Sequence, residues 1–245
     1  TDRIASGGGS GGSRSLQVGG SAVRAGALAL IEAARTRAAE ALEAAEADLE
    51  FSGGAFRVAG TDRAIALRAL AERAPGGQIV ASAENTVGGQ SWPNGCQICE
   101  VEIDPESGAL EITRHSALDD IGTVVNPLVA EGQMQGGMAQ GFGQALLEHC
   151  IYDADSGQLL TGSFMDYAMP RAADMPLELR TAFDERSPTG LNPLGAKGAG
   201  EAGTHGACPA LVDAVLDALA PLGVTALDMP LTREKLWRAV SGARS

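Results

Sequence analysis

One glutamate, Glu201, stands in a run of small residues, "NPLGAKGAGEAG", at positions 192–203. A carboxylate works best as a general base when its pKa approaches the working pH, which requires partial removal from water with little compensating hydrogen bonding. Glycine has no side chain, so glycine neighbours let a metal, a substrate or another backbone approach the carboxylate. The run therefore indicates a general base in a crowded site. From this run alone, a loop glutamate that faces solvent is the alternative.

The same run contains "GAGEAG", residues 198–203, which matches the G-x-G-x-x-G pattern of dinucleotide-binding loops. That fingerprint requires a strand directly before the glycines and a helix that opens within them. Here "SPTGLNPLGAKG", with two prolines, precedes them instead. A nucleotide- or phosphate-binding module is therefore the weaker hypothesis.

A second glycine-rich segment begins at Asn126-Pro127 and predicts a helix that runs to about Cys150. Each interior glycine costs up to about 1 kcal/mol relative to alanine, so a thin helix surface must have a use. The i, i+4 spacing clears one part of that surface for a neighbouring backbone or for a flat ligand, and it leaves both possibilities open. The glycines concerned are Gly132, Gly136, Gly137, Gly141 and Gly143.

The remaining groups that could do chemistry favour structural roles. Cys96 and Cys99 form a C-x-x-C in a strand pattern, where residues three apart face opposite sides, and no second pair completes a zinc site. We therefore predict that all four cysteines, which include Cys150 and Cys208, are buried, reduced thiols. His149 and His205 each stand alone and are not predicted as ligands. Asp119 and Asp120 are adjacent in a strand pattern, so we expect their side chains to face opposite sides. We interpret both as turn or strand-end groups.

The elements that must position these residues mix hairpins with separate helices, which predicts an α+β fold. We expect helices over residues 21–50, over 61–77, from Pro209 and over 231–240; hairpins around Gly53-Gly54, "DPESG" and "DADSG"; and a strand over residues 177–186.

Charge and hydropathy exclude some classes of function. The chain has 18 Lys and Arg against 31 Asp and Glu, a net charge of -13, and no basic stripe, so nucleic acid is not an expected partner. It has no run of roughly 20 apolar residues and no signal-peptide order at its start, so we expect no membrane insertion and a cytoplasmic location.

Three blocks together carry a family resemblance: "GGGSGGSRSLQVGGSAV", "EGQMQGGMAQGFGQALLE" and "GAKGAGEAGTHGACPALVDAVLDAL". They resemble the C-terminal half of the molybdopterin-binding (large) subunit of the xanthine dehydrogenase and aldehyde oxidase family of molybdenum hydroxylases, over residues 1–240. The resemblance implies one C-terminal molybdopterin-binding domain over residues 1–245. It further implies two packed α/β-sandwich subdomains with mixed or antiparallel sheets, roughly 1–125 and 126–245, whose segments can interleave.

The resemblance also implies roles for individual residues. Glu201 matches the general base, and Gln133 matches a glutamine whose amide can donate to the oxo ligand of the metal. The serine-rich turn matches the segment that binds the pterin and its phosphate, where backbone N–H groups and a forked arginine hold an anion. No protein side chain is expected as a metal ligand, and Lys197 receives no role. The implied cofactor contacts are Gly11, Gly12, Ser13, Arg14, Ser15, Gln133, Gly198 and Gly200.

The implied activity is hydroxylation of an aldehyde or N-heteroaromatic carbon in a small molecule, with water as the oxygen source. The cofactor would be molybdopterin or its cytosine dinucleotide form. The chain has no iron–sulfur cysteine pattern and no flavin motif, so iron–sulfur and FAD centres are expected on partner chains or domains. The chain begins at the second half of such a subunit, as a split subunit or a piece of a longer protein. We therefore expect the N-terminal half as a partner, and little molybdenum and no activity in the isolated chain. A non-catalytic structural or interaction fragment is the alternative.

Overall fold

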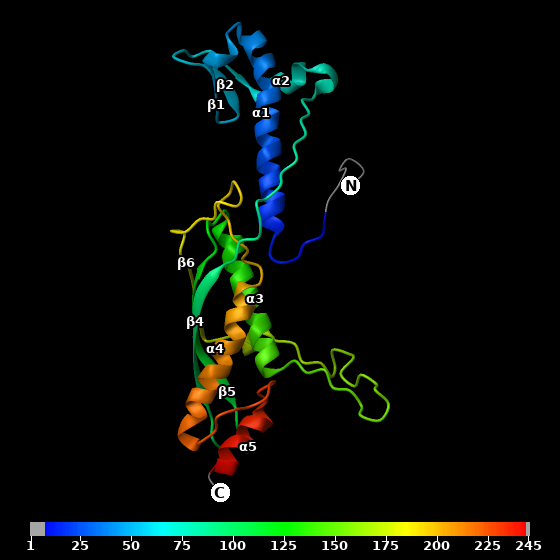
Figure 1. The fold of residues 1–245 in the computed structure, drawn as a ribbon, viewed down its shortest axis with the longest axis vertical. Helices are drawn as coiled ribbons and strands as arrows, with labels where there is room; N and C mark the ends of the chain where they lie inside the picture. The colour runs from blue at the N-terminus through cyan, green and yellow to red at the C-terminus, as the bar shows by residue number, and fades with distance from the viewer. Residues whose placement is uncertain (1–7, 244–245) are drawn as a thin grey trace. The chain divides into compact units, whose positions relative to one another are not determined.

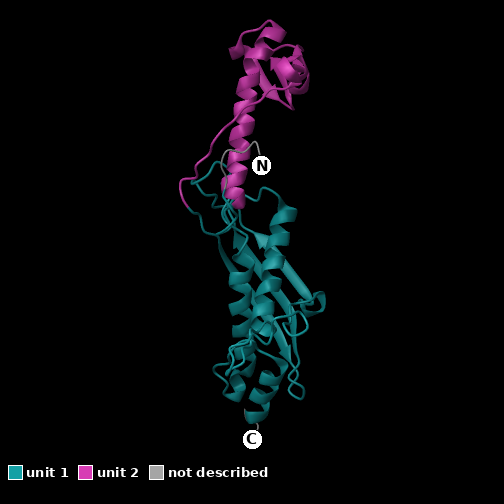
Figure 2. Ribbon diagram, turned by 90° about the vertical axis from the view of Figure 1, so that its right-hand side faces the viewer, with its two compact units in different colours: residues 1–14, 90–245 teal, residues 15–89 magenta. Residues whose placement is uncertain are grey.

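The computed structural model describes residues 8–243, so the first seven residues of the predicted glycine- and serine-rich opening loop lie outside it. The chain forms two compact units, coloured separately in Figure 2. One unit is Ser15–Gly89, and the other combines residues 8–14 with residues 90–243. Each unit has its own hydrophobic core.

The smaller unit packs a long helix, α1 (Ser21–Leu42), against a three-stranded antiparallel sheet of order β1-β2-β3. Ala34 and Ala38 of the helix are fully buried with Phe56 of the sheet. Gly53 and Gly54 have φ of 59° and 78°, which is the backbone of the predicted tight hairpin turn. The other elements are β1 (Leu49–Ser52), β2 (Ala55–Val58), β3 (Ala64–Ala66) and α2 (Leu67–Arg73).

Two helix predictions in this unit were too long. Helix α1 ends at Leu42, where Glu43 takes a left-handed φ of 48°, because the chain then enters β1 at Leu49. The segment predicted as a helix over residues 61–77 instead begins with β3, and α2 starts only at Leu67. Pairing of β3 with β2 outweighs the intrinsic helix propensity of its alanines.

The larger unit covers one face of a mixed sheet with two helices (Figure 1). Strand β4 (Asn94–Ile103) is antiparallel to β5 (Leu110–Asp120), as predicted, and β6 (Glu178–Phe183) is parallel to β5. The helices α3 (Pro127–Leu146) and α4 (Ala202–Leu219) lie side by side, and α5 (Arg233–Ala243) follows near the C-terminus. The predicted α+β class, with one antiparallel and one mixed sheet, is confirmed.

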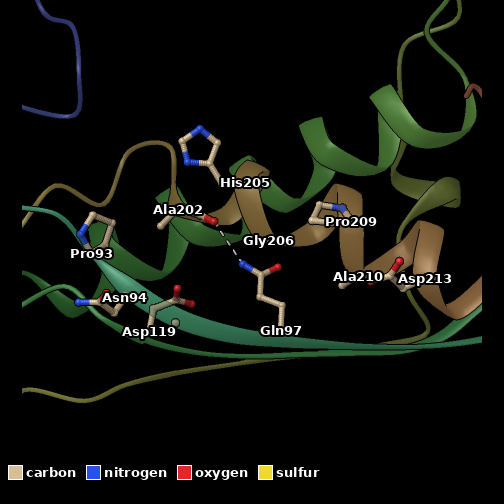
Figure 3. Close-up of a pocket in the computed structure, with 11 residues that line it drawn as sticks. Pro93, Asn94, Gln97, Asp119, Ala202, His205, Gly206, Pro209, Ala210 and Asp213 are labelled. Atoms are coloured by element: carbon tan, nitrogen blue, oxygen red, sulfur yellow. Dashed lines mark hydrogen bonds between the residues drawn. The ribbon is translucent and has the colours of Figure 1, made fainter.

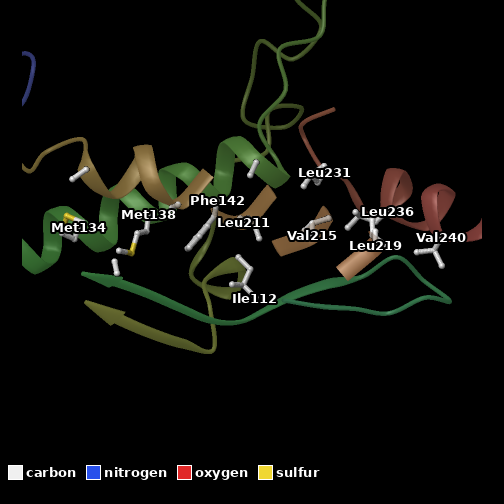
Figure 4. Close-up of a cluster of buried hydrophobic side chains, with 14 residues drawn as sticks. Ile112, Met134, Met138, Phe142, Leu211, Val215, Leu219, Leu231, Leu236 and Val240 are labelled. Atoms are coloured by element: carbon white, nitrogen blue, oxygen red, sulfur yellow. The ribbon is translucent and has the colours of Figure 1, made fainter. Parts of the chain in front are cut away.

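The core of the larger unit lies between α3, α4, α5 and the sheet (Figure 4). Met138 and Phe142 of α3 are buried with Leu211 of α4 and with Ile112 of β5. Because β5 and α3 share this core, the chain does not divide near residue 125, where we placed a subdomain boundary. The compact units divide instead before Ser15 and after Gly89.

Three further boundaries differ from the predictions. Helix α3 ends at Leu146 rather than near Cys150, and the hairpin predicted around "DADSG" is reduced to one bridge between Tyr152 and Leu159. Helix α4 begins at Ala202, so Pro209 is inside it rather than at its start. An interior proline removes one helical hydrogen bond. Among residues 8–243, no helix is long and apolar enough to cross a membrane.

Candidate functional site

The serine-rich segment forms a tight turn that brings Ser13 to the glycine-rich loop before α4. Gly12 and Ser13 have φ of 57° and 54°, and the Arg14 N–H donates to the Gly11 carbonyl at 3.4 Å. A positive φ is unfavourable for most residues but not for glycine, which explains the glycine at position 12. The Ser13 hydroxyl donates to Oε2 of Glu201 at 3.3 Å. Residues 188 positions apart in the sequence therefore meet at one carboxylate.

Glu201 is the N-cap residue of α4, and its carbonyl accepts from the N–H of His205 at 3.1 Å. Its side chain is exposed and makes no capping hydrogen bond to its own helix. The aligned peptide dipoles of this 18-residue helix favour negative charge at that end. The backbone thus fixes the position of Glu201 while its carboxylate remains accessible.

Gly200 brings the backbone close to both Ser13 and Gln133. A Cβ atom added to Gly200 would lie 3.4 Å from Oγ of Ser13 and 3.6 Å from Nε2 of Gln133. The missing side chain therefore leaves a space bounded by a hydroxyl, an amide and the neighbouring Glu201. Gln133 is exposed on α3, as is Gly200 in its loop.

A buried asparagine holds the loop that leads to Glu201. Asn192 donates from Nδ2 to the Ala196 carbonyl at 2.8 Å, and its Oδ1 accepts from the N–H groups of Leu194 and Ala196 at 3.1 and 3.3 Å. The Lys197 N–H donates to the Ile121 carbonyl at 2.8 Å, at the end of the sheet. These bonds connect the loop to the folded sheet and limit where Glu201 can lie.

Lys197 has a role that was not predicted from the sequence. Its Nζ lies 2.6 Å from Oδ2 of Asp120, and the two side chains are 12% and 19% exposed. The hydrogen bond from Lys197 is the main reason that the pKa of Asp120 is below its usual range. Asp119 is buried, so the two adjacent carboxylates are separated as predicted for neighbouring strand residues.

A side-chain pair from the sheet supports the first turn of α4. Gln97 donates from Nε2 to the carbonyls of Ala202 and Gly203 at 3.3 and 3.5 Å, and its Oε1 lies 2.9 Å from Nε2 of His115. Because this amide oxygen can only accept, His115 carries its proton on Nε2. Burial lowers the pKa of His115 to about 4, so the ring is neutral near pH 7.

Neither Gln97 nor His115 was predicted from the sequence, because neither belongs to a motif. One signal was present, since His115 alternates with Ala117 and Asp119 along the predicted strand and so shares their face. All three residues are buried.

The spacing of the α3 glycines left open whether they make room for a neighbouring backbone or for a flat ligand, and different glycines fit each possibility. Cβ atoms on Gly137 and Gly141 would come within 3.0 Å of α4, so these two glycines permit close packing of the two helices. A Cβ added to Gly132 or Gly136 would have no atom of the described residues within 4 Å, and both glycines are exposed on either side of Gln133.

The structure brings some of the predicted cofactor-binding residues close to Glu201 and leaves others apart. Ser13, Gln133, Gly200 and Glu201 form one cluster, which we call the Ser13–Glu201 cluster. Gly198 is buried just before it, and Gly11 and Gly12 are exposed in the turn. The guanidinium of Arg14 donates to the Gly9 carbonyl at 2.9 Å, so in this structure it stabilises its own turn. Ser15 begins the smaller unit.

The cysteine prediction was partly wrong. The four cysteines are free thiols, but Cys96 and Cys150 are exposed, whereas Cys99 and Cys208 are partly buried. Cys96 is on the outward face of an edge strand, which a C-x-x-C spacing does not reveal. Burial raises the pKa of Cys99 to about 12. His149 and His205 are both exposed.

These features define an α+β domain in which a glycine-lined space, two neutral hydrogen-bond donors and one carboxylate converge. Residues 1–176 match the family model described as the molybdopterin cofactor-binding domain. The chain belongs to this family.

The chain resembles relatives and solved structures that are named as dehydrogenases and oxidoreductases. It is 39% identical to the 6-hydroxypseudooxynicotine dehydrogenase complex subunit gamma of Paenarthrobacter nicotinovorans, over 99% of this chain and 31% of that protein. It matches CO dehydrogenase from Oligotropha carboxidovorans with a TM-score of 0.87 and 32% identity, over 99% and 31% of the two chains. It matches quinoline 2-oxidoreductase from Pseudomonas putida 86 with a TM-score of 0.82 and 34% identity, over 98% and 32%. The chain thus spans about a third of the length of these proteins.

Proposed function

We propose that this chain supplies part of the active site of a molybdenum hydroxylase, with Glu201 as the general base. The observation that carries the proposal is the Ser13–Glu201 cluster, in which the Ser13 hydroxyl contacts the Glu201 carboxylate beside the open side of Gly200. The family to which the chain belongs supports a molybdenum–pterin cofactor as the group that this cluster faces.

The residues of the cluster fit such a cofactor. The space beside Gly200 is one that any side chain at this position would fill, and Gln133 and Ser13 border it with an amide and a hydroxyl. The turn over residues 11–14 has successive positive φ values at Gly12 and Ser13, and a glycine-rich turn of this kind can offer backbone N–H groups to an anionic phosphate or oxo group. We propose Gly11, Gly12, Ser13, Gln133, Gly198 and Gly200 as the residues that would hold the cofactor, with Arg14 and Ser15 flanking them.

When bound, the cofactor would supply the two-electron oxidation of a substrate carbon, with oxygen that comes from water. The contribution of this chain is to accept a proton. The Ser13 hydroxyl donates to Oε2 of Glu201, which leaves Oε1 to receive the proton. The amide of Gln133 can donate to an oxygen in the space beside Gly200 and so orient it.

The remaining parts of the enzyme would come from other chains or domains. We propose the N-terminal half of the molybdopterin-binding subunit as the partner that completes the pocket, because the chain spans only about a third of its relatives. Electrons would then pass to iron–sulfur and FAD centres outside this chain. The substrate would be a small aldehyde or N-heteroaromatic molecule, and the pterin would be molybdopterin or its cytosine dinucleotide form.

The test is the substitution Glu201→Gln in the assembled enzyme. Loss of a general base costs roughly 100-fold or more in turnover, whereas a neutral amide of the same size should leave molybdenum and pterin content unchanged. Glu102→Gln is the matched control, because Glu102 is an exposed glutamate on β4. Turnover that stays at the level of this control would refute the role of Glu201.

A further inference from the structure

A cleft of about 410 Å³ lies in the larger unit, between the start of β4, the end of β5 and the N-terminal half of α4 (Figure 3). Its apolar wall includes Pro93 and Pro209, and its polar groups include Gln97, Asp119, His205 and Asp213. The Ser13–Glu201 cluster uses none of these side chains.

Asp119 is the unusual group in this cleft. It is only 4% exposed, and its Oδ2 has no hydrogen-bond partner among the residues that the structure describes. Its carboxyl group points from β5 towards the first turn of α4 (Figure 3). Gly95 is its partner across the sheet, and a Cβ on Gly95 would overlap with the Asp119 carboxyl. The chain therefore places a glycine where a side chain would displace this acid.

A buried carboxylate oxygen without a partner is costly, since it loses hydration and gains no compensating bond. Burial raises the pKa of Asp119 to about 6, so the group is still mostly ionised at neutral pH. Within the described part of the chain, no lysine or arginine lines the cleft, and the nearby Lys197 is paired with Asp120. Asp213 adds a second negative charge at the exposed side of the cleft.

The missing partner is therefore a cation that can donate hydrogen bonds. Among residues 8–243, no group of three or more His, Cys, Asp and Glu side chains is arranged to hold a metal ion, so an organic cation fits better. An ammonium or guanidinium group supplies both the charge and the N–H donors that a carboxylate requires. The prolines that line the cleft can pack against the carbon atoms attached to such a group.

We propose that this cleft binds an ammonium or guanidinium group through Asp119. The group could belong to a small free amine or to a lysine or arginine side chain of a partner polypeptide, and the chemistry at Asp119 is the same in both cases. This site does not depend on the role proposed for Glu201.

The test is a titration of the 245-residue chain with methylguanidinium at concentrations well below those that unfold proteins, followed by amide chemical shifts in NMR. We expect saturable shifts at the start of β4 and in the first half of α4. Methylurea, a neutral molecule of the same shape, should produce none. Asp119→Asn should weaken methylguanidinium binding by roughly tenfold or more, since a hydrogen bond to a charged group is lost. Asp217→Asn, an exposed residue of α4 outside the cleft, is the matched control.

Equal affinity for methylguanidinium and methylurea would overturn the proposal, even if Asp119→Asn failed to fold. Equal affinity of Asp119→Asn and Asp217→Asn for methylguanidinium would overturn it as well. A second titration, of the chain assembled with its partner polypeptide, separates the two sources of the cation. Loss of methylguanidinium binding in the assembly assigns the cation to a partner side chain, and retained binding assigns it to a small free molecule.

Discussion

Substitution of Gly203 by alanine tests the close contact between α3 and α4 beside the candidate site. A Cβ on Gly203 would overlap with the carbonyl oxygen of Met134 and lie 2.9 Å from the Met138 nitrogen. Both are backbone atoms of a helix, so they cannot turn aside as a long side chain could. Gly203→Ala must therefore separate the two helices or distort one of them.

The expected cost follows from two opposing terms. Overpacking of a tight interior costs about 1–3 kcal/mol, and the upper part of this range applies because backbone must shift. Replacing a helical glycine by alanine contributes about 1 kcal/mol in the other direction. We therefore expect Gly203→Ala to lower the free energy of unfolding by about 2 kcal/mol.

The matched control is Gly136→Ala in α3, where a Cβ would have no described neighbour within 4 Å. This change should raise the free energy of unfolding by about 0.5–1 kcal/mol through helix propensity alone. Urea unfolding followed by tryptophan fluorescence measures both, since Trp92 and Trp237 belong to the larger unit. If Gly203→Ala proved as stable as Gly136→Ala, close helix packing at Gly203 would be refuted.

The remaining predictions concern titratable side chains that are buried or partly buried. His115 has its pKa lowered to about 4, so the folded state binds fewer protons than the unfolded state between about pH 4 and 6.5, and acidification removes up to about 3 kcal/mol of stability. Asp119, with its pKa raised to about 6, has the opposite effect, because stability falls as pH rises from about 4 to 6. Both effects can be measured by urea unfolding at pH 4.5 and pH 7. On acidification, His115→Gln should gain stability relative to the wild type, and Asp119→Asn should lose stability relative to the wild type. If both variants and the wild type changed stability by the same amount, both pKa shifts would be refuted. Lys197→Met should cost about 1–3 kcal/mol and raise the pKa of Asp120, measured by unfolding and by carboxyl NMR, whereas an unchanged Asp120 titration would exclude their pairing.

Local patterns were enough to predict most elements, whereas the approach of distant motifs was predicted from the family resemblance. Alternation on both sides of "DPESG" predicted the β4–β5 hairpin, and Asn126-Pro127 predicted the start of α3, where Asn126 does cap the helix by accepting from Val129 N–H. The resemblance placed Ser13, Gln133, Gly200 and Glu201 at one site, and the structure brings these four residues together.

Long-range pairing accounts for what the sequence could not predict. The alanines at 64–66 favour a helix locally, but they pair with β2 as a strand. Gly203 packs against α3 in the first turn of α4, and no pattern within residues 198–209 indicates that contact. Lys197 pairs with Asp120 at the end of β5, and Gln97 contacts His115 of β5 and the first turn of α4. Spacing along the chain gives no sign of these long-range partners.

If the Ser13–Glu201 cluster faces the cofactor, the most direct test is to fill the space that the cluster borders. Gly200→Leu would place a side chain against Ser13 and Gln133, whereas Gly190→Leu adds one at an exposed position with no described neighbour within 4 Å. The measurement is the molybdenum and pterin content of each variant, purified as an assembly with its partner chains. We predict a loss of roughly tenfold for Gly200→Leu and normal content for Gly190→Leu. Equal content in both variants would contradict the proposed position of the cofactor.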